Sequence, residues 1–87
     1  MPDTQSTKDQ IRQWVMETAE RKGVEVAGDD DSLTMNGVID SLAIFRLVSF
    51  LEDTFGVRIA DEEIVNENFR SINEIDRLVT SKQSAKV

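Results

Sequence analysis

Apolar residues recur at helical spacing through the middle of the chain, between residues 37 and 55. One stripe contains Ile44, Leu47, Val48, Leu51 and Phe55. Steps of three or four residues place these side chains on one face of an α-helix, which is the face that a core would cover. A short polar residue, Asp40 or Ser41, stands where a side-chain oxygen can accept from the first-turn amides, and Gly56 is placed to end the helix.

Two further helices are predicted, one near each end of the chain. The first begins at Thr7, which forms a capping-box pattern with Gln10, and Gly23 stops it. Its core positions are Ile11, Trp14, Val15 and Thr18 or Ala19. The last begins at Ser71, with Glu74 completing a second capping box. Its core positions are Ile72, Ile75, Leu78 and Val79.

The segment 24–39 is too long for a tight turn and is broken by glycines, so it predicts a long ordered loop. The loop is expected to be anchored by Val26, Leu33, Met35 and Val38 or Ile39. Its run of three aspartates, residues 29–31, lacks the glycine that a calcium-binding EF-hand needs at its sixth position. No metal site is therefore predicted.

A short helix is predicted after the middle helix and an extended crossing at residues 57–59. Three acidic residues at 61–63 open it, as the helix dipole favours, with Ile64 and Val65 facing inward and Phe69 filling the space beneath. The expected fold is all-α. It is a small four-helix bundle of three longer helices and one short one, with a long loop between helices one and two and the second helix in the middle. Residues 1–87 form a single domain with a core of about 7–81, and the termini, 1–6 and 81–87, are frayed.

Composition excludes several classes of function. The 87 residues include no cysteine and no histidine, so disulfides, CxxC metal sites and a Ser-His-Asp hydrolase in its usual form are all excluded. Acidic pairs such as Glu62 and Glu63 lack an accompanying base. We therefore predict no catalytic residues and a protein that is not an enzyme.

The net charge of −7 is concentrated in one part of the chain. Residues 29–63 contain nine acids and two bases, while the remainder of the chain is balanced. This acidic surface should attract basic partners and repel nucleic acid, and it would also keep a small protein in solution. No apolar run of about eighteen residues and no signal peptide is found, so we expect a cytoplasmic protein without a membrane segment.

The face of the middle helix opposite the core stripe contains apolar residues that the core does not use. Leu42 lies there with Arg46, Ser49 and Asp53, and Phe45 lies on one shoulder. A large apolar side chain beside an exposed serine, Ser41, indicates a docking surface.

An ordered set of residues around Ser41 resembles the carrier proteins of thiotemplated biosynthesis, which include acyl, peptidyl and D-alanyl carriers. The matching residues are Asp40-Ser41-Leu42, Leu47-Val48, Leu51-Glu52, Phe55-Gly56 and Ile59-Ala60-Asp61-Glu62-Glu63, and the likeness covers residues 37–79. In that family the serine of Asp-Ser-Leu is esterified to 4′-phosphopantetheine, whose thiol holds cargo as a thioester. The resemblance implies that Ser41 is the attachment site.

The start of a helix suits such a group, because free amides and the positive end of the dipole favour a phosphodiester. The resemblance also implies the partners. A phosphopantetheinyl transferase would add the arm from coenzyme A, an adenylating ligase, synthetase or acyltransferase would load it, and downstream biosynthetic enzymes would use the cargo. A monomer would meet them through Asp40, Leu42, Phe45, Arg46 and Ser49.

The cargo stays open between aminoacyl, peptidyl and acyl groups. Gly37 stands four residues before the serine, whereas common fatty-acid carriers have glycine three before it, and Glu67-Asn68-Phe69 also looks more like stand-alone aminoacyl or peptidyl carriers. Arg46 departs from the acid that acyl carriers often place there. The alternative function is an unmodified acidic adaptor that binds a partner through Leu42 and Phe45, and it would not need the Ser41 hydroxyl.

Overall fold

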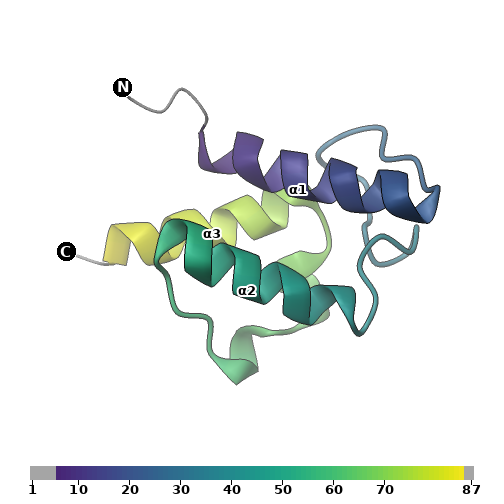
Figure 1. The fold of residues 1–87 in the computed structure, drawn as a ribbon. Coiled ribbons are helices and arrows are strands. Elements are labelled where there is room, and N and C mark those ends of the chain that lie inside the picture. The colour runs from purple at the N-terminus through teal and green to yellow at the C-terminus, as the bar shows by residue number, and fades with distance from the viewer. Residues whose placement is uncertain (1–5, 86–87) are drawn as a thin grey trace.

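The computed structural model describes residues 6–85 and shows three α-helices joined by loops (Figure 1). These are α1 (Thr7–Lys22), α2 (Ala43–Phe55) and α3 (Ile72–Ala85). Two short 3-10 turns, η1 (Asp61–Glu63) and η2 (Asn66–Phe69), precede α3, and no strand occurs between residues 6 and 85. The all-α prediction is confirmed. The predicted count of four helices is not confirmed, because the segment expected to form the short helix forms two separate 3-10 turns, the first of which begins at Asp61 as expected.

Helices α1 and α3 pack most closely against each other, and α2 packs against α3. Helix α2 also contacts α1, because Phe50 of α2 stacks on Trp14 of α1, so the central position expected for the second helix stays a prediction. Figure 1 shows α1 and α2 running in opposite directions, with the end of α1 and the start of α2 at the same side of the molecule. The loop that joins them lies at that side as well.

Local signals define the ends of the helices. Ser6 caps α1 by accepting from the amide of Asp9 at 3.1 Å, so the predicted cap at Thr7 is displaced by one residue. Gly23 and Gly56 end α1 and α2 in the left-handed conformation, with φ of 70° and 66°, which glycine adopts without strain. Ser71 caps α3 through the amide of Glu74, as predicted.

The prediction of frayed ends at 1–6 and 81–87 can be compared with the structure only at Ser6, which caps α1, and at residues 81–85. Residues 81–85 continue α3, so the predicted loose tail is wrong for them. Residues 1–5 and 86–87 lie outside the part of the chain that the structure describes.

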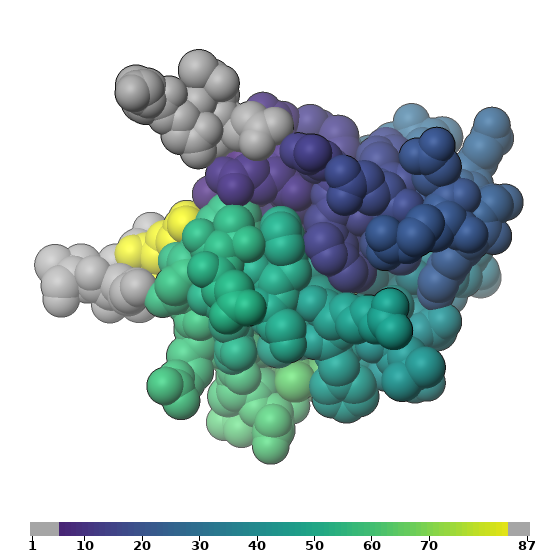
Figure 2. Space-filling view, viewed as in Figure 1, coloured from purple at the N-terminus to yellow at the C-terminus, as the bar shows by residue number. Residues whose placement is uncertain are grey.

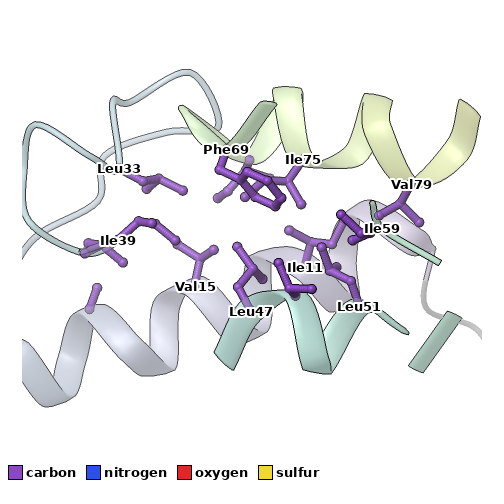
Figure 3. Close-up of a cluster of buried hydrophobic side chains, with 14 of the residues drawn as sticks. Ile11, Val15, Leu33, Ile39, Leu47, Leu51, Ile59, Phe69, Ile75 and Val79 are labelled. Carbon is purple, nitrogen blue, oxygen red and sulfur yellow. The ribbon is translucent and has the colours of Figure 1, made fainter. Parts of the chain in front are cut away.

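The core is built from one face of each helix together with residues of the connecting segments (Figure 3). Phe69 is fully buried beneath the turns that precede α3, as predicted, and Figure 3 shows its ring between Leu33 and Ile75. From α2, the predicted stripe contributes Leu47 and Leu51 at zero exposure. The other fully or almost fully buried apolar residues are Ile11, Val15, Ala19, Val38, Ile39, Ala43, Val48, Val57, Ile59, Ile72 and Val79.

Two residues predicted to face inward are exposed. Met35 is 88% exposed, because the loop turns there: the amide of Ile39 donates to the Leu33 carbonyl at 2.9 Å, which leaves Met35 at the outside of the bend. Val65 is 40% exposed, because extended backbone between the two 3-10 turns directs it outward. Leu33 alone enters the core from the centre of the loop, and its amide donates to the Arg70 carbonyl at 2.7 Å.

The three consecutive aspartates fasten this loop to the helices. Asp29 accepts two hydrogen bonds from the guanidinium of Arg12 on α1, at 3.0 and 2.8 Å. Asp30 accepts from the side-chain amide of Asn73 at the start of α3, and Asp31 accepts from the backbone within the loop. The cluster therefore has a structural role for each carboxylate.

The burial pattern at α2 predicts that truncation of Leu51 and of Leu42 lowers the stability of the fold by very different amounts. Leu51→Ala should lower the free energy of unfolding by about 2–5 kcal/mol, because Leu51 is fully buried and its removal leaves a cavity. Leu42→Ala should cost less than about 1 kcal/mol, because Leu42 is 72% exposed. Urea denaturation of both variants measures this, and equal midpoints would show that the face of α2 is assigned wrongly.

Candidate functional site

The turn that leads into α2 is organised by the carboxylate of Asp40. One of its oxygens accepts from the amides of Leu42 and Ala43 at 3.0 and 2.8 Å. Its backbone carbonyl accepts from the amide of Ile44 at 3.0 Å. Of the two caps that the sequence offered, Asp40 is therefore the one that starts the helix, and Ser41 is left for another role.

Ser41 lies in this turn with its side chain exposed. Within residues 6–85, neither its hydroxyl nor its amide makes a hydrogen bond. The expectation that free first-turn amides would receive a phosphate is wrong for Leu42 and Ala43, because Asp40 already uses them. What the turn presents to solvent is the hydroxyl of Ser41.

Lys22, in the last turn of α1, holds the segment that precedes Ser41. Its ammonium donates to the second carboxylate oxygen of Asp40 at 2.7 Å and to the carbonyls of Gly37 and Val38 at 3.1 and 3.0 Å. The pKa of Asp40 is lowered to about 2, chiefly by the hydrogen bond from Lys22 and then by the one from the Ala43 amide. Asp40 is thus ionised across the neutral range. Its carboxylate accepts from Lys22 of α1 and from the first amides of α2 at the same time.

Sequence reasoning did not identify Lys22 as part of the site. A basic residue before a terminating glycine is common, because it complements the negative end of the helix dipole. Its acceptors lie fifteen to eighteen residues further along the chain, beyond an irregular loop. Only the path of that loop brings them together.

The face of α2 that the sequence predicted to be free is free in the structure. Leu42 and Phe45 are 72% and 61% exposed, and Arg46 and Ser49 are also exposed. Their helical spacing gathers all four on the outer side of α2, beginning directly after Ser41.

A groove of about 170 Å³ lies between the last two turns of α1 and the start of α2. Figure 2 shows this side of the molecule, with the purple and blue surface of α1 above the teal surface of α2. The half-buried Trp14 forms part of the groove wall and also stacks on Phe50, with ring centroids 6.0 Å apart. The groove is lined by Trp14, Thr18, Arg21, Lys22, Asp40, Leu42, Ala43 and Arg46.

Two other features are absent from residues 6–85. No group of three or more acidic residues is placed to hold a metal ion. None of the helices there has the length and apolar character needed to cross a membrane.

Comparison with known proteins assigns the family. Residues 9–79 match the family described as "Phosphopantetheine attachment site", which is most of the chain. The chain belongs to the phosphopantetheine-attachment family. The fold is also similar to the crystal structure of an acyl carrier protein from Thermotoga maritima, with a TM-score of 0.64 and 30% identity over 90% of this chain and 91% of that one. No curated protein sequence matches.

Membership of the phosphopantetheine-attachment family defines the cofactor. It is 4′-phosphopantetheine, held covalently. Carrier proteins of this family work together with partner enzymes. The predicted resemblance to carrier proteins is therefore confirmed, and so is the cofactor that it implied.

The contacts of Asp40 predict how acid affects this family member. A carboxyl group whose pKa is lowered in the folded state stabilises the fold above its unfolded pKa, and that stabilisation is lost as the pH falls through the folded value. For Asp40 this loss of stability is expected between pH 3.8, the ordinary pKa of the group, and about pH 2, its pKa in the folded state. Asp40→Asn keeps a capping side chain but removes the charge that Lys22 contacts, so its melting temperature should fall less than that of the wild type across this window.

Asp53→Asn, an exposed acid on the same helix, is the matched control and should behave as the wild type. Thermal melts at about pH 6 and about pH 2 compare the three proteins. Identical losses in all three would show that the contact with Lys22 contributes nothing to stability.

Proposed function

We propose that this chain is a carrier protein that holds biosynthetic intermediates as thioesters on a 4′-phosphopantetheine arm attached to Ser41. The observation that carries the proposal is the state of the Ser41 hydroxyl. It is exposed at a turn fastened by Asp40 and Lys22, and no described residue hydrogen-bonds to it. Membership of a family defined by phosphopantetheine attachment supports Ser41 as the residue to be esterified.

The residues around Ser41 fit such a group. An ester with the Ser41 oxygen needs a hydroxyl that a partner enzyme can reach, and no side chain of residues 6–85 blocks it by hydrogen bonding. The chain has no cysteine, so a thioester cannot form on its own side chains. When attached, 4′-phosphopantetheine supplies the thiol that this sequence lacks.

The neighbouring residues prepare Ser41 for modification without taking part in the chemistry. Asp40 fixes the first turn of α2 by accepting from two amides, and Lys22 holds Asp40 in place. Both oxygens of that carboxylate already accept hydrogen bonds, and within residues 6–85 neither accepts one from the Ser41 hydroxyl. The transferase would then have to remove the proton of the Ser41 hydroxyl and activate coenzyme A as the donor. The chain itself would not be an enzyme.

The outer face of α2 would be the surface that partner enzymes recognise. It follows Ser41 directly and exposes two large apolar side chains, Leu42 and Phe45, beside Arg46 and Ser49. Partners would include a phosphopantetheinyl transferase, an adenylating ligase or acyltransferase that loads the arm, and the enzymes that take the cargo. The cargo would be an aminoacyl, peptidyl or acyl group, and the likeness to an acyl carrier protein supports the last of these.

The same exposed face favours one alternative, an adaptor that binds a partner through Leu42 and Phe45 without modification. Such a protein would not depend on Ser41.

Attachment at Ser41 can be tested by intact-mass measurement. After incubation with coenzyme A and a broad-specificity phosphopantetheinyl transferase, the wild type should gain the mass of one phosphopantetheine. Ser41→Ala should gain none, while Ser81→Ala, which changes an exposed serine of α3 outside the proposed docking face, should be modified as a control. Equal modification of Ser41→Ala, or no modification of the wild type beside a known carrier, would contradict the proposal.

Recognition through α2 can be tested by loading kinetics. Leu42→Ala and Phe45→Ala should each slow modification by the transferase on the order of tenfold, because apolar side chains at the centre of a small interface contribute much of its binding energy. The matched control is Val65→Ala, an apolar residue that is 40% exposed outside α2 and should react at the wild-type rate. Unchanged rates for both α2 variants, with folding verified by circular dichroism, would exclude this face as the docking surface.

A further inference from the structure

The groove between α1 and α2 contains two arginines, Arg21 and Arg46, that form no ion pair within residues 6–85, although Asp40 lines the same groove. Arg46 is exposed, and no hydrogen bond or ion pair to its guanidinium occurs within residues 6–85. Arg21 makes one long hydrogen bond, 3.5 Å, to the Thr18 hydroxyl. By contrast, Lys22 in the same groove already contacts Asp40 and two carbonyls. The chain has a net charge of −7, so two such arginines in one small groove favour the binding of an anionic group there.

The position of the groove suggests where that anion comes from. Asp40 and Leu42, the residues on either side of Ser41, both line it. Ser41 itself does not line the groove, so a phosphodiester on Ser41 would place a negative charge beside it, next to two of its lining residues. At a helix start such a group usually receives hydrogen bonds from first-turn amides, but here those of Leu42 and Ala43 donate to Asp40. Beside the unpaired amide of Ser41 itself, side chains would therefore have to supply the remaining hydrogen bonds.

Arg46 is suited to this role by its place on the helix. It lies one turn after Leu42, and long side chains on an α-helix lean toward the N-terminal end, which is the end that contains Ser41. A guanidinium can donate two parallel hydrogen bonds to a phosphate. Arg21 reaches the same groove from α1, so the two groups approach from opposite walls.

Resting on the attachment proposed above, we propose that Arg46 and Arg21 bind the phosphodiester on Ser41 and direct the arm into the groove along Trp14. The groove has a volume of about 170 Å³, which leaves space for part of a slender chain to lie along it. The wall formed by Trp14, Leu42 and Ala43 is suited to the apolar parts of such a chain.

The chain contains a reporter for this contact, because Trp14 is its sole tryptophan. The test compares apo and fully modified protein, each verified by intact mass, for the wild type, Arg46→Gln, Arg21→Gln and the double variant. Arg58→Gln is the control, since Arg58 is exposed beyond the far end of α2 and outside the groove. Acrylamide quenching of Trp14 fluorescence and the ³¹P resonance of the phosphodiester are measured for every form.

Modification should reduce the quenching of Trp14 in the wild type and in Arg58→Gln. Each groove variant should lower the docked population about two- to fivefold, the range expected for exposed ion pairs, and the double variant should lose most of the protection. The ³¹P resonance should shift in the groove variants only, and added salt should weaken protection in the wild type.

Two results would overturn the inference. If modified wild type and modified double variant show the same quenching and the same ³¹P resonance, the arm does not bind these arginines, while the measured mass still supports attachment at Ser41. If the mass shows no attachment at all, the proposed function fails and this inference fails with it.

Discussion

The ammonium of Lys22 joins the end of α1 to the segment that leads into α2. It contacts two carbonyls and one carboxylate, and its side chain is only 30% exposed. An isolated ion pair on a protein surface contributes little, because water and salt screen it and two side chains lose freedom. Here one group meets three acceptors from residues 37–40, so the freedom of the side chain is lost once for all three contacts. The orientation of the turn that contains Ser41 follows from this junction.

The loop between α1 and α2 is fastened a second time, near its middle. Arg12 of α1 binds Asp29 through two hydrogen bonds, and the amide of Leu33 donates to Arg70 just before α3. A chain segment without helix or strand would otherwise leave many backbone groups and conformations unrestrained. Because its contacts reach both α1 and the start of α3, the loop braces the end of the molecule where Ser41 lies.

The parts of the fold that could be predicted are those that neighbouring residues decide. The buried stripe of α2 and the glycine stops follow from spacing and from backbone preference, and the structure reproduces them. The burial of Met35 and Val65 was predicted wrongly. Both residues are apolar, but each lies where the backbone turns outward. Irregular segments have no fixed period, so a sequence pattern cannot tell which of their side chains reach the core.

At the site too, features that neighbouring residues decide were predicted, and features that depend on the path of the loop were not. The exposure of Leu42 and Phe45 follows from the helical wheel and is observed, while Ser41 as the attachment site stays a prediction. The competition for the first-turn amides was not predicted, since it depends on whether Asp40 or Ser41 acts as the cap. The contact of Lys22 depends on the path of a loop, which no local rule describes.

Helix α2 is anchored at both of its ends. At its start Asp40 binds two amides, and near its end the carboxylate of Glu52 accepts from the amide of Ile59 at 2.9 Å beyond the terminating Gly56. The outer face between these anchors is therefore preorganised, and a partner that docks on it pays almost no entropy to order the backbone. If partner enzymes dock there as proposed, a contact limited to a few side chains of one short helix would also make each complex short-lived. Rapid, reversible encounters with several enzymes in succession are the kinetic regime that such a surface supports.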